Sequence, residues 1–153
     1  TRIAPLLAQR LQTLHPDLVP RVVPEPNHVS VRLPVPAHPG HELRADIYEE
    51  GATIAYDDGR PPGPAERMLV WGNASDGAAL YAMMGLMEEV FADRLLLVRE
   101  PLSGWVRFLR RQDCDSLLGF VPVEEFRRWP ERRRKRVGEC WVWSGANLPS
   151  TPA

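Results

Sequence analysis

Histidines and acidic residues in the first part of the chain are the first candidates for metal chemistry. His38 and His41 form a His-x-x-His pair across a Pro-Gly turn, and Asp57 and Asp58 stand before Gly59 in a later loop. A zinc site needs three or four ligands, and a calcium loop needs regularly spaced oxygen ligands with a closing Glu. The two other histidines, His15 and His28, belong to separate elements. We therefore expect no metal site. His38 and His41 should be exposed histidines of a turn, and Asp57, Asp58 and Gly59 should form a second turn.

A glycine-flanked serine is the candidate for nucleophilic catalysis. Residues 72–77 read GNASDG between an expected strand and an expected helix, which is the context of a nucleophile elbow. That motif requires G-x-S-x-G, however, and here the serine is displaced by one position. Ser75 or Asp76 is better explained as the cap of the helix that follows. We also expect no phosphate site here, since Asp76 would repel an anion.

The two cysteines, Cys114 and Cys140, form no Cys-x-x-Cys pair and are too few for a disulfide scaffold. Cys114 lies between Asp113 and Asp115, and two neighbouring carboxylates disfavour the thiolate that a nucleophilic cysteine needs. We expect both cysteines to be reduced and to pack as small apolar residues. The sequence thus indicates no catalytic residue and no cofactor.

A basic cluster is the sharpest charge feature, and residues 127–136 carry a net charge of +6. Trp129 lies within it, so a single-stranded nucleic acid would find cations for its phosphates and a ring for base stacking. The same cluster could instead face an acidic protein surface. The candidate binding residues, for protein or nucleic acid, are Arg127, Arg128, Trp129, Arg132, Arg133, Arg134, Lys135 and Arg136.

The expected helix over residues 77–93 is apolar on more than one side. One stripe at helical spacing consists of Leu80, Met83, Met84, Met87, Val90 and Phe91. The opposite side begins with Ala78, Tyr81, Ala82 and Gly85. Either the helix over residues 3–14 covers this side, with Gly85 permitting close approach, or a partner does. In the second case the candidate interface is Tyr81, Met83, Met84 and Met87.

The elements that hold these residues follow from periodicity and from proline. Helical spacing predicts a helix over 3–14, while seven prolines make residues 16–40 an extended segment. Alternation predicts strands at 29–35, 43–47, 53–56, 68–71, 95–99, 104–109 and 141–143, and Pro122 and Pro130 bound a short helix.

Hairpin connections with a single long helical crossover favour the α+β class: an antiparallel sheet of about five to seven strands, with the N-terminal helix and the long central helix packed on one face. We expect one domain over residues 1–148 and a flexible tail over 149–153. Its core should contain Leu7, Leu11, Val29, Val31, Leu33, Leu43, Ile47, Val70, Leu97, Val106 and Phe108.

The composition is that of an ordinary globular domain, with 153 residues, 44% hydrophobic, 25% charged and a net charge of -1. Arginine outnumbers lysine by 18 to 1, which indicates a GC-rich, bacterial genome. The N-terminal stretch lacks a signal-peptide core and no run is long enough to span a membrane, so we expect a cytoplasmic protein. Residues 1–106 carry a net charge of -5 and residues 107–153 a net charge of +4, which suits self-association or internal complementarity.

Three classes of function remain open. The leading hypothesis is a non-enzymatic protein-interaction domain, comparable in size to small immunity or chaperone-like modules, whose partner is another protein or a second copy of itself. The alternative is a nucleic-acid-associated protein that uses the basic cluster. The third is an enzyme whose site is assembled from residues distant in the sequence, for which a deep polar pocket near His38 or Asp57 would be the sign.

Overall fold

The computed structural model describes residues 2–99, 104–110 and 139–145. In chain order the elements are α1 (Ile3–Leu14), β1 (Arg21–Pro24), β2 (Val29–Pro34), β3 (Glu42–Ile47), β4 (Gly51–Asp57), β5 (Ala65–Val70), α2 (Asp76–Phe91), β6 (Leu95–Arg99), β7 (Val106–Arg110) and β8 (Glu139–Trp141). Strands β1 to β5 pair with their sequence neighbours to form one antiparallel sheet, and β6 pairs with β7 on one side and β8 on the other.

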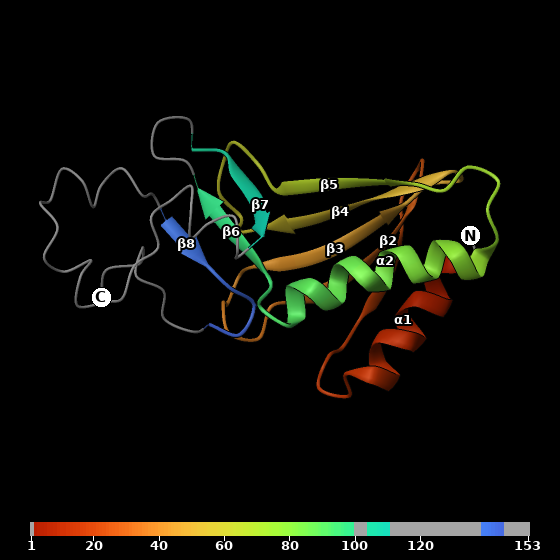
Figure 1. The fold of residues 1–153 in the computed structure, drawn as a ribbon, viewed down its shortest axis with the longest axis horizontal. Helices are drawn as coiled ribbons and strands as arrows, with labels where there is room; N and C mark the ends of the chain where they lie inside the picture. The colour runs from red at the N-terminus through yellow and green to blue at the C-terminus, as the bar shows by residue number, and fades with distance from the viewer. Residues whose placement is uncertain (1, 100–103, 111–138, 146–153) are drawn as a thin grey trace, which may run out of the picture.

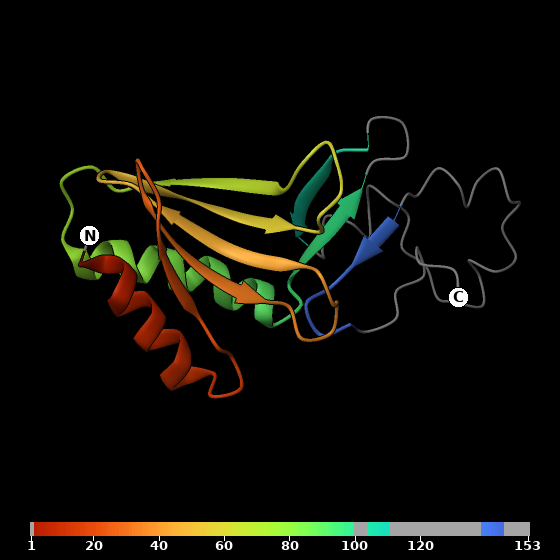
Figure 2. The same ribbon diagram turned by 180° about the vertical axis from the view of Figure 1, so that it is seen from behind.

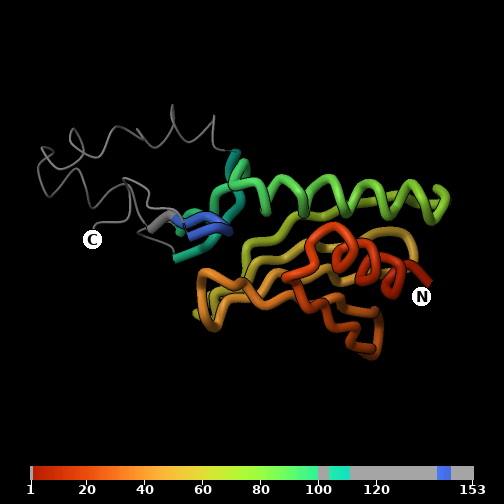
Figure 3. Tube along the Cα trace, turned by 90° about the horizontal axis from the view of Figure 1, so that it is seen from below, coloured from red at the N-terminus to blue at the C-terminus, as the bar shows by residue number. Residues whose placement is uncertain are grey.

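Both helices lie on one face of the five-stranded sheet (Figures 1 and 2). The predicted α+β class is confirmed, with an N-terminal helix and a long second helix on an antiparallel sheet. The described strands are divided over two sheets, since β6 pairs with β7 and β8 and with no strand of the first sheet. Seen from below, α1 packs beside α2 (Figure 3).

Each helix forms where the sequence pattern predicts it. In α1, Ile3, Leu7 and Leu11 are buried at helical spacing. In α2, the Ser75 side chain accepts a hydrogen bond of 3.2 Å from the Ala78 amide, which satisfies one of the free donors in the first turn. Ser75 is thus the helix cap, as expected.

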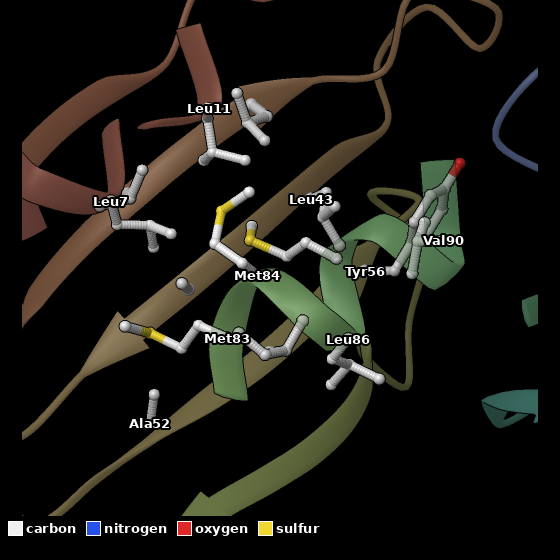
Figure 4. Packing of buried hydrophobic residues seen from close by; sticks show 14 of the residues in the cluster. Leu7, Leu11, Leu43, Ala52, Tyr56, Met83, Met84, Leu86 and Val90 are labelled. Atoms are coloured by element: carbon white, nitrogen blue, oxygen red, sulfur yellow. The ribbon is translucent and has the colours of Figure 1, made fainter. Parts of the chain in front are cut away.

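The core fills the space between the helices and the sheet. Alternate residues of β2, β3 and β4 point inward, among them Leu33, Leu43 and Ile54, which are completely buried. Figure 4 shows labelled side chains of both helices and of the sheet meeting in this cluster. The predicted core is confirmed at most of its positions. It is wrong at Val70, whose side chain is 78% exposed, because β5 turns this residue to the face that the helices do not cover.

The proline-rich segment contains a strand that the sequence pattern did not predict. Strand β1 pairs with β2 and forms one edge of the sheet, with Pro24 as its last residue. Proline is tolerated there because an edge strand needs hydrogen bonds on one side only. The predicted short helix after Pro122 and the tail over 149–153 lie outside the described residues. Neither α1 nor α2 is long and apolar enough to cross a membrane, and the described ranges contain no other helix.

Candidate binding site

A groove runs between α1 and α2 on the side away from the sheet, with a volume of about 490 Å³. We call it the helix groove. It is lined by Arg10, Leu14, His15, Tyr81, Met84, Gly85 and Glu88. The last turns of α1 and the middle of α2 supply the residues that line its two walls.

The middle of the helix groove is apolar and open. Tyr81 is 83% exposed and Leu14 is 55% exposed, whereas Met84 is buried and closes the bottom of the groove. Gly85 leaves additional room, since a Cβ atom built on it would meet no atom within 4 Å. The expectation that Gly85 permits close approach of α1 to α2 is therefore wrong. Gly85 instead leaves space in the groove that a side chain would fill.

The polar residues of the helix groove are unequally partnered. At one end His15 donates a hydrogen bond of 2.6 Å from Nε2 to the Glu88 carboxylate, and the His15 ring also packs edge-on against Phe91. Arg10 is exposed, and among the described residues it has no ion-pair partner. The Glu88 carboxylate thus accepts a hydrogen bond within the chain, whereas the Arg10 side chain is exposed to solvent.

The residues proposed for an interface separate into two groups. Met83 and Met87 are completely buried in the core beneath α2. Tyr81 lies on the outer side of the same helix, and Met84 lies between the core and the helix groove. Of the four candidate residues, Tyr81 and Met84 are therefore the two that the groove brings together.

The histidines near the proline turn belong to a second polar cluster, where the first sheet meets β8. His41 Nδ1 and the Tyr56 hydroxyl share a hydrogen bond of 2.7 Å, and His38 Nε2 donates to the Val142 carbonyl at 2.7 Å. The two imidazole rings stack with their centroids 5.2 Å apart. Both histidines are partly buried and bonded, so the expectation of exposed turn histidines is wrong.

Burial controls proton binding in this histidine cluster. The pKa of His41 is lowered chiefly because the ring is withdrawn from water, and the neighbouring His38 lowers it further. Burial also raises the pKa of the Tyr56 hydroxyl, whose residue has no exposed surface. These groups are enclosed by packing, and each forms a hydrogen bond within the chain.

Asp58 continues this cluster toward the second sheet. Its buried carboxylate pairs with Arg99 of β6 and, at 3.1 Å, with Arg60. Burial alone would raise the pKa of Asp58, but the hydrogen bonds from Arg99 and Arg60 outweigh it and lower the pKa. The neighbouring Asp57 accepts a hydrogen bond of 2.8 Å from the Gly59 amide, which confirms the expected turn. Within the described ranges, no three His, Cys, Asp or Glu side chains come together as metal ligands.

The remaining sequence candidates lie elsewhere. The basic cluster Arg127, Arg128, Trp129, Arg132, Arg133, Arg134, Lys135 and Arg136 lies outside the described residues, as does Cys114. Four groove residues were not expected as site residues from the sequence: Arg10, Leu14, His15 and Glu88. Leu14 continues the apolar spacing of Ile3, Leu7 and Leu11, so the sequence contained no signal that it would be exposed.

Comparison of the chain with protein-family models, with characterised proteins and with solved structures gives no match. The inference of function therefore starts from the helix groove.

Proposed function

We propose that this chain is a non-enzymatic protein-interaction domain that uses the helix groove to bind a short segment of another protein. The bound segment carries an apolar anchor residue with a carboxylate beside it. The observation that carries the proposal is the exposed Tyr81 above an apolar groove of about 490 Å³.

The apolar part of the groove supports a protein ligand. Tyrosine offers a large ring with few rotatable bonds and a polar hydroxyl, and it is enriched among residues that dominate binding energy. Met84 at the bottom can change rotamer to fit different side chains. An anchor residue placed between Tyr81 and Leu14 would remove apolar surface from water on both walls, which is the main favourable term in association.

Charge supports the second half of the ligand description. The Glu88 carboxylate accepts a hydrogen bond from His15, so part of its hydrogen-bonding capacity is already used within the chain. Arg10 projects from the α1 wall without a described ion-pair partner and would form a charge-assisted hydrogen bond with a carboxylate of the ligand. An acidic residue next to the anchor therefore fits better than a basic one.

The side chains that the enzyme hypothesis would need already form hydrogen bonds within the chain. His38, His41, Tyr56 and Asp58 each bond to a neighbour within the chain. The nucleic-acid alternative rests on the sequence of residues 127–136 and is tested separately below. The comparison with small immunity and chaperone-like modules stays part of the proposal, at the level of a compact domain that acts by binding.

The test is a selection of random linear peptides with the full chain, followed by fluorescence polarisation of the selected peptides. We expect selected peptides to share an apolar residue next to Asp or Glu. Tyr81→Glu should weaken their binding by about tenfold or more, and Arg10→Ala should remove the preference for the carboxylate. The matched control is Tyr48→Glu, since Tyr48 is an exposed tyrosine outside the groove. Selected peptides that bind Tyr81→Glu as tightly as the unmodified chain would refute the proposal.

A further inference from the structure

The two edges of the five-stranded sheet differ in how well they are protected from pairing with another strand. Strand β1 is four residues long, begins with Arg21 after Pro20 and ends with Pro24. Short length, proline and charge are the devices that prevent an edge strand from pairing. Strand β5 is six residues long and contains neither proline nor glycine. The β5 edge is therefore the one able to accept a further strand.

The hydrogen-bond pattern shows which backbone groups of β5 are available. The Trp71 amide donates to the Glu50 carbonyl at 2.9 Å, on the side of β4. Because an antiparallel strand alternates its bonding direction, Leu69 and Arg67 also turn toward β4. The amide and carbonyl groups of Glu66, Met68 and Val70 consequently point away from the sheet. Among the described strands none pairs with them, and β7 lies near the beginning of β5 and pairs with β6 (Figure 1).

The side chains of the same three residues lie on the face of the sheet that the helices leave open. Met68 is 74% exposed and Val70 is 78% exposed. Elsewhere this face carries charged residues in ion pairs, such as Arg44 with Asp46 at 3.0 Å and with Asp57 at 3.3 Å. An exposed apolar pair beside backbone groups that no described strand pairs with favours strand addition.

We propose that β5 pairs antiparallel with β5 of a second copy of this chain, with Met68 on the two-fold axis. This register pairs Met68 with Met68, Glu66 with Val70, and Arg67 with Leu69. The outward backbone groups of Glu66, Met68 and Val70 then face their counterparts and can form a hydrogen-bonded ladder. The two sheets become one continuous ten-stranded sheet, with all four helices on the same side.

Charge permits pairing with a second copy in the Met68-centred register and disfavours registers shifted toward the N-terminus. Moving the two-fold axis one position toward the N-terminus would place Arg67 opposite Arg67, and a shift of two positions would place Glu66 opposite Glu66. Like charges directly opposite one another destabilise a strand pair. The Met68-centred register instead places an apolar residue opposite each charge. In this register no like charges oppose each other, so β5 can pair with its own copy across a two-fold axis.

The experiment uses two variants of the full chain, Met68→Glu and Met68→Lys, studied by sedimentation velocity. Met68 is largely exposed, so both variants should melt at nearly the temperature of the unmodified chain. The unmodified chain should form a dimer with a weak dissociation constant, below about 1 mM, since one strand pair makes a small interface. Each variant alone should dimerise at least about tenfold more weakly, because each places two like charges on the axis. An equimolar mixture should restore the dimer, since Glu then faces Lys.

The control is Val19→Glu, which adds the same charge at an exposed valine before β1 and should leave dimerisation unchanged. A monomer at all concentrations, or dimerisation of Met68→Glu equal to that of the unmodified chain, overturns the proposal. So does a mixture of the two variants that stays monomeric, because recovery on mixing is specific to a residue that faces its own copy. These results are independent of the helix groove, whose test uses Tyr81.

Discussion

At the scale of single residues, α2 shows that side chains of one helix serve different purposes. We expect Tyr81→Glu to change the free energy of unfolding by no more than about 0.5 kcal/mol, because the ring is largely in solvent. Met83→Ala should lower it by about 2–5 kcal/mol, because Met83 is completely buried and its removal leaves a cavity. Urea unfolding of the two variants measures both values. Equal destabilisation by the two changes would show that Tyr81 packs within the chain.

His41 gives a pH prediction whose sign follows from its environment. Burial and the neighbouring His38 lower its pKa in the folded chain, whereas the unfolded chain has the ordinary value of about 6.5. As the pH falls below about 6.5, the unfolded chain therefore binds a proton at His41 that the folded chain does not bind. The free energy of unfolding should decrease over this range. Charged neighbours contribute as well: Asp57 and Asp58 raise the pKa, and Arg60 lowers it.

Urea unfolding at about pH 7.5 and about pH 5.5 tests this prediction. In His41→Asn the free energy of unfolding should depend less steeply on pH, because the side chain no longer titrates. The slope should fall by up to the contribution of one bound proton. Tyr56→Phe is the control: it removes the hydrogen-bond partner of His41 but not the imidazole, so it should lower stability and keep the slope. An unchanged slope in His41→Asn would show that this imidazole is protonated alike in both states.

Sequence could predict which residues are apolar and on which stripe, but not which stripe a neighbour covers. The spacing of α2 placed Met83, Met87 and Tyr81 in one candidate interface. The structure separates them, because the position of α1 relative to α2 decides what is covered, and that position results from long-range packing. The bonding of His38 to Val142 likewise joins residues more than a hundred positions apart, for which spacing carries no signal.

At the scale of elements, periodicity was most informative where an element is amphipathic. Helix α1 has the predicted bounds, and β6 coincides with the predicted strand. Strand β1 escaped prediction because its apolar residues Val22 and Val23 are adjacent and do not alternate, and because Pro20 precedes it and Pro24 ends it. Strand β5 was expected to begin at Met68 but begins at Ala65, since the charged pair Glu66 and Arg67 hides the alternation in an edge strand.

The pairing of β5 with β4 explains the error at Val70. Alternation predicts that the side chains of Val70 and Leu69 point to opposite faces of the sheet, but it does not predict which face the helices cover. Register with Gly51 of β4 places Val70 on the open face. An apolar residue left there by the fold is what the proposed β5 pairing would cover.

At the scale of the whole molecule, charge is distributed unevenly along the chain. Residues 1–106 carry a net charge of -5 and residues 107–153 a net charge of +4, with the basic cluster in the second part. This arrangement attracts nucleic acid less than a uniformly basic surface does, because the acidic part repels phosphates over distances of about a Debye length. We therefore expect this chain to bind nucleic acid weakly and without sequence preference.

We expect single-stranded oligonucleotides to bind the full chain at low salt and to dissociate near 0.15 M salt, where screening is effective over about 8 Å. Each phosphate neutralised by an arginine releases counterions, so the logarithm of the affinity should fall steeply and linearly with the logarithm of the salt concentration. Changing Arg132, Arg133, Arg134, Lys135 and Arg136 to Ser should abolish the low-salt binding, while Arg10→Ala should not. Fluorescence anisotropy across a salt series measures these effects. The nucleic-acid alternative would be favoured over the protein-interaction proposal if affinity persisted at physiological salt and were lost in the five-residue variant. Contacts other than phosphate neutralisation, such as base stacking on Trp129, would then have to hold the strand.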